Sequence, residues 1–396
     1  MGHDKLADEL QALLSEPLTA AIERERSAFD RASAPFSERI VLYGAGRFGK
    51  HISACMRKVG LAPVAFADHN PALDGEHIHG IPVYSPLKAA ELFGRSAAFA
   101  ITVWNSSATD RMTNRVQQLK NLGCERVFPV GLLCWKYPEA FLPYYPLDLP
   151  HKALSTADDI SAALSLFSDD NSRKEYAGQV RFRLLLDYDS LGSPLGADYY
   201  FQSDLFSIGP DEVLVDCGAF DGDTVADFVR LQGESFRSII AFEPDPQNWE
   251  KLQTRLNQLP SAVKMKIESL PYALGSSTCT VRFNSTGTDA ARIGQGQDSV
   301  ECVTLDQALR DVTPTILKFD IEGAELDALA GAREVIARSR PVLAVSCYHQ
   351  QSHLWEIPLE LARTCHDYQF FLRPHGVEGW DLLCYAVPQE RLRRRN

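Results

Sequence analysis

Two glycine-rich turns in this sequence follow short apolar segments, and they differ in the ligand that each could hold. The first turn, GAGRFG at positions 44–49, has the spacing G-x-G-x-x-G ahead of a helical pattern. Such glycines permit a tight turn and the close approach of a phosphate to a helix N-terminus. Asp68 ends the next apolar segment, where a carboxylate can bind ribose hydroxyls. Gly44, Gly46, Gly49 and Asp68 therefore predict a nucleotide or nucleotide-sugar site, with a nicotinamide cofactor site and a purely structural turn as the alternatives.

The second turn, DCGAFDG at positions 216–222, begins with a carboxylate. A pyrophosphate would be repelled by Asp216, whereas the ammonium of an amino-acid ligand needs an acceptor of that kind. Glu243 ends the following apolar segment, where it can accept hydrogen bonds from both hydroxyls of a ribose. This combination fits S-adenosylmethionine better than NAD, and the alternative is that these acids only cap helices. The residues expected to bind this cofactor are Asp216, Gly218, Ala219, Gly222, Glu243 and, from the next motif, Asp320.

A third motif, KFDIEGAE at positions 318–325, places three carboxylates after another apolar segment. Such a cluster is costly unless ligands or cations use it, although Glu325 alone could complement a helix dipole. His349 follows a further apolar segment, at the same edge of the expected sheet, and histidine can accept a proton near neutral pH. His349 is therefore the first candidate for a catalytic base, with Asp320 second and Glu322 as a further catalytic candidate. A structural histidine is the alternative. A metal held by Asp320 and neighbouring acids stays open as well, but because the ligand set is incomplete, no metal ligand is predicted.

The elements expected to position these residues alternate between strands and helices. Leucines at helical spacing predict a helical N-terminal segment, and two βαβ series separated by a helical stretch follow it. One strand is expected near residues 263–268. The fold class is therefore α/β, with mostly parallel sheets covered on both faces. The expected divisions are a helical segment 1–36, a Rossmann-like domain 37–150, a helical lead-in 151–208, a larger α/β domain 209–390 and a basic tail 391–396.

The composition excludes several classes of protein. The chain has 396 residues, 45% of them hydrophobic and 23% charged, as in ordinary globular proteins. A net charge of −12 argues against nucleic acid and anionic lipid as partners. The nine scattered cysteines form no C-x-x-C pair, which predicts free thiols in a reducing compartment. Because no signal peptide and no apolar run of roughly 18–20 residues is visible, we expect a cytoplasmic protein without a membrane span.

The motifs beyond residue 199 resemble those of FkbM-type methyltransferases. VDCGAFDGDT, AFEPDP, TLDQAL, KFDIEGAE and SCYHQQSHLWEIP occur in the order of that family across residues 199–388. The resemblance implies a class I S-adenosylmethionine-dependent fold, with seven strands of which the last is antiparallel. It also implies methyl transfer to an oxygen, with hydroxyls of sugars, glycans or secondary metabolites as acceptors.

The family's functional residues carry over to defined positions of this sequence. Asp216, Gly218 and Gly222 would form the first cofactor motif, and Glu243 would hold the ribose. The acids of the 318–325 motif would line the sheet edge near the methionine portion and the acceptor. Bacterial members often have Tyr-His where His349 stands and continue with Lys and an acid, whereas the run QQS follows here. A charged acceptor contact at this point is therefore not implied.

The N-terminal part is similar to small Rossmann-like modules of bacterial sugar-modifying enzymes, through VLYGAGRFGKHI and FADHNPALDGEHIHGIPV. This similarity implies an accessory domain that binds a nucleotide-sugar or a partner. Two other functions stay open: an NAD-dependent oxidoreductase that uses the turn at 44–49, and a nucleotide-sugar-binding regulatory protein. Residues 37–150 hold no recognisable dehydrogenase pair, and the intact set Asp216, Glu243 and Asp320 favours methyl transfer. The expected partner is a small-molecule or glycan acceptor, and the sequence does not determine an oligomeric state.

Overall fold

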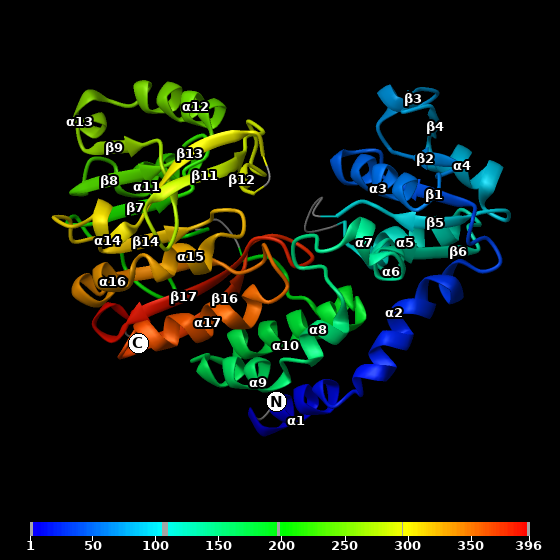
Figure 1. The fold of residues 1–396 in the computed structure, drawn as a ribbon, viewed down its shortest axis with the longest axis horizontal. Helices are drawn as coiled ribbons and strands as arrows, with labels where there is room; N and C mark the ends of the chain where they lie inside the picture. The colour runs from blue at the N-terminus through cyan, green and yellow to red at the C-terminus, as the bar shows by residue number, and fades with distance from the viewer. Residues whose placement is uncertain (1–2, 105–109, 196–198, 295, 394–396) are drawn as a thin grey trace.

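The computed structural model describes residues 3–104, 110–195, 199–294 and 296–393 of the chain. These residues form three sheets, of which two belong to separate α/β lobes and the third is a small sheet beside the larger lobe. Figure 1 shows the two lobes side by side, joined below by a group of helices.

The N-terminal lobe contains the smaller Rossmann-like sheet that the sequence predicted. The strand order is β3-β4-β2-β1-β5-β6, and only the β3–β4 pair is antiparallel. The central strands are apolar and buried because helices cover both faces of the sheet. The strands are β1 (Ile40–Tyr43), β2 (Ala65–Ala67), β3 (His77–Ile78), β4 (Ile81–Tyr84), β5 (Ala98–Ile101) and β6 (Arg126–Pro129). The helices are α3 (Arg47–Lys58), η1 (Pro71–Leu73), α4 (Pro86–Phe93), α5 (Met112–Asn121), α6 (Gly131–Lys136) and α7 (Pro138–Phe141).

The larger lobe contains a seven-stranded sheet in the order β16-β17-β15-β14-β7-β8-β9. The last strand is antiparallel to both of its neighbours and the other pairs are parallel, which confirms the expected fold. The strands are β7 (Val213–Cys217), β8 (Ser238–Phe242), β9 (Ile267–Leu270), β14 (Ile316–Phe319), β15 (Val342–Ser346), β16 (Tyr368–Pro374) and β17 (Leu382–Pro388). The helices are α11 (Asp223–Gln232), α12 (Pro246–Asn257), α13 (Ser261–Lys264), α15 (Glu325–Ala330), α16 (Arg333–Ser339) and α17 (His353–Thr364).

The strand expected near residues 263–268 is wrong in its first half. Residues 261–264 form the helical turn α13, and β9 begins only at Ile267. Pro260 has the backbone geometry of a residue that precedes a helix, and Val263 and Lys264 both donate to its carbonyl oxygen. Val263 therefore belongs to a helical turn, and Met265 follows that turn as its C-cap residue, so neither is part of a strand.

The small sheet lies between β9 and β14 in the chain and has the order β10-β13-β11-β12. It is antiparallel except for the β10–β13 pair. Its segment between β11 and β12 carries Asp289 toward the other lobe. The elements are β10 (Ala273–Leu274), β11 (Cys279–Asn284), β12 (Arg292–Ile293), β13 (Asp298–Val303) and the short helix α14 (Leu305–Ala308).

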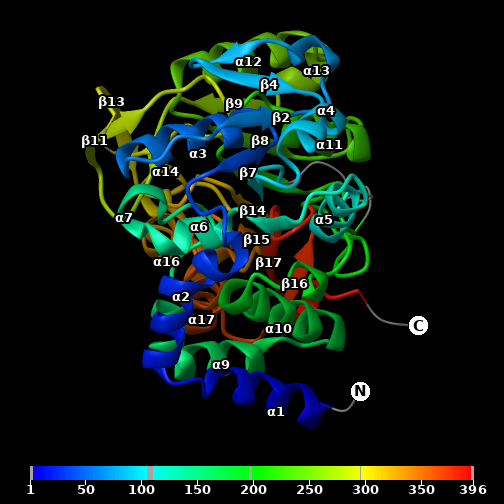
Figure 2. The ribbon, with the colours of Figure 1, turned by 90° about the vertical axis from the view of Figure 1, so that its right-hand side faces the viewer.

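Helices from the start and the middle of the chain lie below both sheets, as Figure 2 shows from the side. Leu10 and Ile160 share one buried core with Leu343 of the large sheet. The second helix continues to the N-terminal lobe, where the ring of Phe29 lies 5.7 Å from that of Phe128. The first helices therefore contact both lobes. These elements are α1 (His3–Leu14), α2 (Leu18–Ser33), α8 (Pro150–Leu154), α9 (Ala157–Leu166), α10 (Asp170–Leu185), η2 (Tyr188–Ser190) and, after β17, η3 (Gln389–Arg391).

A buried ion pair ties the loop between β16 and β17 to the N-terminal lobe. Arg115 Nη1 lies 2.9 Å from Glu378 Oε2, and the two side chains are 1% and 0% exposed. The indole nitrogen of Trp104 donates to the carbonyl oxygen of Glu378 at 2.8 Å. The same loop carries Trp380, whose ring lies 5.3 Å from that of Trp104. These contacts fix how the two lobes face each other.

Candidate active site

The carboxyl ends of four strands of the larger sheet meet at one edge. Asp216 lies near the end of β7, Glu243 follows β8, Asp320 follows β14, and His349 comes shortly after β15. Ligands bind at this edge in open α/β sheets, because the loops that follow the strands surround it. The structure therefore brings the predicted cofactor and catalytic residues together from distant parts of the sequence.

Asp216 is fully buried and pairs with Lys318, its neighbour across β7 and β14. Lys318 Nζ lies 2.9 Å from Asp216 Oδ1 and donates to the carbonyl oxygen of Gly218 at 2.6 Å. Burial raises the pKa of Asp216 to about 6, although Lys318 opposes the shift. Burial lowers the pKa of Lys318, but the carboxylates of Asp216 and Asp320 outweigh it and the net shift is upward. Lys318 lines a cleft that lies between the two lobes, and Asp216 does not. Asp216 therefore holds the Lys318 side chain in place from the side away from the cleft.

The glycines of the 216–222 turn occupy positions that a larger residue would disturb. Gly218 and Gly222 both have φ +88°, and a Cβ atom on Gly218 would lie 2.0 Å from the carbonyl oxygen of Asp320. The turn therefore packs against the end of β14 only because this residue has no side chain. Ala219 is buried, and its backbone N–H donates to Phe242 at 2.8 Å. Ala219 therefore stabilises the turn, since its side chain is buried and its backbone N–H is already used in a hydrogen bond.

Glu243 is 5% exposed and binds the backbone on both sides of it. Its Oε2 accepts from Phe220 N at 2.8 Å, and its Oε1 accepts from Asp245 N at 2.8 Å. Burial raises the pKa of Glu243 to about 7, and the two backbone hydrogen bonds partly offset this shift. A carboxylate has about four acceptor positions, so each oxygen can still accept from a ligand.

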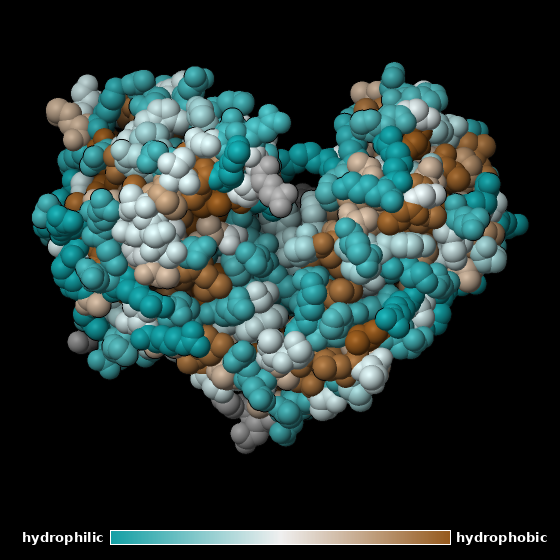
Figure 3. Space-filling view, viewed as in Figure 1, coloured by the Kyte–Doolittle hydropathy of each residue, from teal (hydrophilic) through white to brown (hydrophobic). Residues whose placement is uncertain are grey.

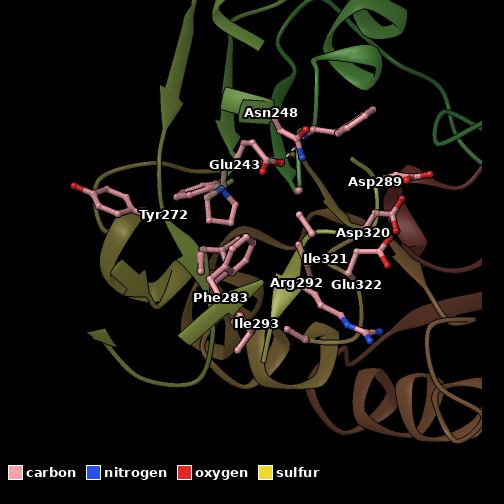
Figure 4. A pocket seen from close by; sticks show the side chains of 18 of the residues that line it. Glu243, Asn248, Tyr272, Phe283, Asp289, Arg292, Ile293, Asp320, Ile321 and Glu322 are labelled. Atoms are coloured by element: carbon pink, nitrogen blue, oxygen red, sulfur yellow. Dashed lines mark hydrogen bonds between the residues drawn. The ribbon is translucent and has the colours of Figure 1, made fainter. Parts of the chain in front are cut away.

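A cavity beside Glu243 has the character of a nucleoside site. Its walls include Asn248, Tyr272, Phe283 and Ile293, which come from α12 and the region of the small sheet. Figure 4 shows Glu243 and Asn248 at one end of the cavity and the carboxylates after β14 at the other. Aromatic and apolar walls with a few placed polar groups are typical of small-molecule sites. The residues present therefore fit an adenosine group.

The two carboxylates that follow β14 each accept a hydrogen bond from a tyrosine. Tyr200 Oη donates to Asp320 Oδ2 at 2.6 Å, and Tyr145 Oη donates to Glu322 Oε2 at 3.1 Å. Asp320 and Glu322 line both the cavity and the cleft that adjoins it. Together with Asp289, they are the acidic residues that line both spaces.

His349 lies beneath these two carboxylates. Its Nδ1 is 2.8 Å from Glu325 Oε1, and its Nε2 is 3.3 Å from both Asp320 Oδ1 and Glu322 Oε1. Burial lowers the pKa of His349, but Glu325 and Glu322 outweigh it and hold the pKa well above its usual value. A protonated imidazole cannot accept a proton, and the described residues that line the cleft do not include His349. Its role as the base stays a prediction, while its place suits the support of Asp320 and Glu322.

Both glycine-rich turns face one cleft of about 1330 Å³ between the lobes. Figure 3 shows this hollow between the two lobes. Gly44 and Gly46 line it from the N-terminal lobe, and Gly218 and Phe220 line it from the larger lobe. The exposed side chains of Arg47 and Asp289 meet across it, with Nη1 and Oδ1 2.9 Å apart. A molecule in this cleft would contact both lobes.

Asp68 binds backbone N–H groups of the N-terminal lobe with both of its carboxylate oxygens. Asp68 Oδ2 accepts from Ala45 N at 2.6 Å, and its Oδ1 accepts from Asn70 N at 2.8 Å. A Cβ atom on Gly49 would lie 1.9 Å from the carbonyl oxygen of Gly44, so this glycine serves the packing of helix against strand. Gly46 faces open space. The prediction of a nucleotide at Gly44, Gly46, Gly49 and Asp68 therefore stays a prediction.

The sequence motifs did not single out several residues that line the cleft: Tyr145, Tyr200, Lys318, Trp380 and Asp381. Burial, followed by the charge of Asp320, raises the pKa of Asp381 to about 6, while Tyr199 and Tyr348 oppose this shift. Lys318 gave one signal in the sequence, as a charged residue inside an apolar strand. The others belong to loops, where no pattern marks a position near the sheet edge.

Sheet order, antiparallel last strand and strand-end carboxylates together define the class I methyltransferase fold in the larger lobe. The family model described as Methyltransferase FkbM domain matches residues 216–372. This match confirms the resemblance to FkbM methyltransferases that the motifs of this part of the chain indicated. No curated protein matches the sequence.

Solved structures extend the comparison to the whole chain. The crystal structure of a methyltransferase FkbM from Methylobacillus flagellatus has 23% identity and a TM-score of 0.78, covering 96% of this chain and 99% of that one. This likeness shows that the chain, including both of its lobes, has the same fold as that protein. A putative methyltransferase from Streptococcus mutans, in complex with SAH, has 11% identity over 47% of this chain and 93% of that one, with a TM-score of 0.27. UDP-D-quinovosamine 4-dehydrogenase from Vibrio fischeri has 22% identity over 23% and 75%, with a TM-score of 0.20. TM-scores this low say nothing about the fold or ligands of this chain.

Three further expectations concern the surface and the thiols. No helix in the described residues is long and apolar enough to cross a membrane. The nine cysteines are free thiols, and all but Cys279 are buried. In the basic tail, Arg391 forms an ion pair with Glu212 at 2.7 Å, while residues 394–396 lie outside the described residues.

Proposed function

We propose that this chain is an S-adenosylmethionine-dependent O-methyltransferase that acts on a hydroxyl of a sugar, a glycan or a secondary metabolite. The continuity of the cavity beside Glu243 with the cleft between the lobes supports this proposal most, because Gly218, Asp320 and Glu322 line both. A cofactor held in the cavity would present its reactive end to a molecule in the cleft.

The residues around the cavity suit the parts of this cofactor. Glu243 has acceptor positions left for the ribose hydroxyls, and Tyr272 and Phe283 offer apolar walls to the base. Lys318 suits the carboxylate of the methionine portion. Since Asp216 is engaged with Lys318, we assign the cofactor's ammonium to Asp320. Bound in this way, the cofactor supplies an activated methyl group, and the chain has to hold the acceptor oxygen in line with it.

Aromatic side chains from both lobes give the cleft the walls that a sugar ring needs. The rings of Tyr145 and Trp380 lie 4.6 Å apart, and those of Phe48 and Tyr144 lie 4.9 Å apart. Aromatic faces pack against the apolar faces of sugar rings, while nearby carboxylates accept hydrogen bonds from the hydroxyls. In this proposal the N-terminal lobe forms one side of the acceptor site, and any nucleotide attached to the acceptor would lie toward Gly46.

The acceptor hydroxyl has to lose its proton as the methyl group is transferred. Asp381 is the carboxylate best placed to take this proton, because it lines the cleft and lies beside Asp320 and Trp380. Its pKa of about 6 leaves it ionised at neutral pH yet more basic than an ordinary aspartate. Glu322 would orient the acceptor, and His349 would hold Asp320 and Glu322 in position.

Binding and transfer measurements test the proposal together. We expect calorimetry to show binding of S-adenosylhomocysteine and no binding of NADH. Incubation with labelled S-adenosylmethionine and a panel of nucleotide-sugars and glycans should then transfer the label to a hydroxyl oxygen, as located by mass spectrometry. Glu243→Ala should abolish the transfer at low cofactor concentration, and the exposed Glu250→Ala serves as the matched control. Binding of NADH without binding of S-adenosylhomocysteine would overturn the proposal.

A further inference from the structure

Three side-chain atoms converge just beneath the cleft, and two of them lack the hydrogen bonds that would satisfy them. His349 Nε2 and Asp320 Oδ1 are buried and make no hydrogen bond, although they lie 3.3 Å apart. Glu322 Oε1 lies 3.3 Å from the same nitrogen. The side chain of His349 is 1% exposed, so water does not replace the missing partners. Such a buried, unsatisfied group requires an explanation.

The spacing of these atoms is that of ligands around a metal ion. With metal–ligand bonds of about 2.1 Å, neighbouring ligand atoms lie about 3.0 Å apart in an octahedron and about 3.4 Å apart in a tetrahedron. Both 3.3 Å separations fall within this interval. In the described residues, Asp320, Glu325 and His349 also form a group whose ligand atoms all lie within 4.8 Å of one another.

The groups behind these atoms orient them as the outer shell of a metal site does. Glu325 is fully buried, and its Oε1 lies 2.8 Å from His349 Nδ1 while it also accepts from Ile321 N at 2.9 Å. A carboxylate on Nδ1 fixes the tautomer that leaves a lone pair on Nε2. Tyr200 and Tyr145 bind the far oxygens of the two carboxylates, which leaves Asp320 Oδ1 and Glu322 Oε1 directed at His349.

We infer that His349 Nε2, Asp320 Oδ1 and Glu322 Oε1 bind a first-row divalent cation, with Glu325 as the residue that orients the imidazole. A mixed set of imidazole and carboxylate ligands suits Mn²⁺ or Zn²⁺ better than the all-oxygen preference of Mg²⁺ and Ca²⁺. Without a cation, the proton on His349 balances part of the surrounding negative charge. Since the site lies where Asp320 and Glu322 meet the cleft, the cation would hold an acceptor hydroxyl; this role, unlike the binding itself, rests on the proposed function.

Manganese binding to the full chain tests the inference without any cofactor or acceptor. Free Mn²⁺ gives an electron paramagnetic resonance signal that disappears on binding, and we expect one bound ion per chain. His349→Gln and Glu322→Gln should each weaken binding at least tenfold, and Glu325→Gln by about 10–100-fold. His366→Gln, at an exposed histidine away from the cleft, should bind as the wild type does.

Two results would overturn the inference: no binding by the wild type, or equal binding by folded His349→Gln. Circular dichroism establishes that each variant folds, and Glu322→Gln keeps the test decisive because this side chain is partly exposed and its loss should not unfold the protein. Calorimetry with S-adenosylhomocysteine in the presence of EDTA separates this inference from the proposed function. Cofactor binding without Mn²⁺ binding would leave the methyltransferase proposal standing and refute only the metal site.

Discussion

The buried carboxyl of Glu243 should make the stability of the ligand-free protein fall as the pH rises. Burial raises the pKa of this group to about 7 in the folded chain, against an ordinary value of 4.5. A raised pKa contributes stability that is present below the unfolded-state value and is lost as the pH rises through the folded-state value. The relevant window is therefore pH 4.5–7.

The size of this effect follows from the two pKa values. Each pKa unit corresponds to about 1.4 kcal/mol, so the full difference is worth about 3 kcal/mol, of which about 2.5 kcal/mol falls between pH 5 and pH 8. Little discount for solvent is needed because Glu243 is 5% exposed. Glu243→Gln keeps the shape of the side chain and removes the ionisation.

Urea unfolding of the wild type and of Glu243→Gln, followed by circular dichroism at pH 5, 6, 7 and 8, measures this contribution. We expect the free energy of unfolding of the wild type, relative to the variant, to fall by about 2.5 kcal/mol across the series. Glu250→Gln, at an exposed position on the following helix, should show no such trend relative to the wild type. A wild-type-to-variant difference that stays constant with pH would refute the reasoning, because Glu243 would then titrate as it does in the unfolded chain.

Three further predictions concern the cofactor, the N-terminal turn and the contact between the lobes. Glu243→Ala should weaken binding of S-adenosylhomocysteine in calorimetry, since each charge-assisted hydrogen bond to the ribose is worth about 1.5–3 kcal/mol; an unchanged dissociation constant in a folded variant would exclude this role. Gly46→Trp should fold, because Gly46 faces open space, and should leave the affinity for S-adenosylhomocysteine unchanged while it reduces transfer to an acceptor that reaches the N-terminal lobe; loss of cofactor binding in the folded variant would contradict this. Glu378→Gln removes a buried counter-charge of Arg115 and should cost about 3 kcal/mol in urea unfolding, whereas Glu250→Gln should cost almost nothing; equal costs would show that the pair does not hold the lobes together.

Hydrophobic periodicity predicted most of the strands and helices, because it is a local property of the sequence. The two βαβ series are present as the patterns predicted, and the seven strands with an antiparallel last strand are present as the family resemblance implied. The strand near 263–268 failed because a short apolar stretch satisfies both periods, and Pro260 favoured a helical turn at its start. Such stretches are decided by their neighbours in space.

The sequence by itself determined which residues can meet at one sheet edge. Asp216, Glu243 and Asp320 each stand at the end of an apolar run, and the carboxyl ends of parallel strands must lie on the same side of the sheet. The same reasoning placed His349 there. The sequence also predicted the turn at Gly218 and Gly222. Both residues have φ +88°, and Gly218 lies close to the end of β14, so both positions require glycine.

Only the tertiary structure decided which partner each of these side chains takes. Asp216 faces Lys318 because strand order sets β7 beside β14, and His349 lies among carboxylates that raise its pKa because α15 brings Glu325 beneath it. The two glycine-rich turns face one cleft because long-range contacts, such as Arg115 with Glu378, set the lobes against each other. Local sequence patterns determine which residues form each strand and which residues follow it. The distance between side chains on different elements depends instead on how the whole chain packs.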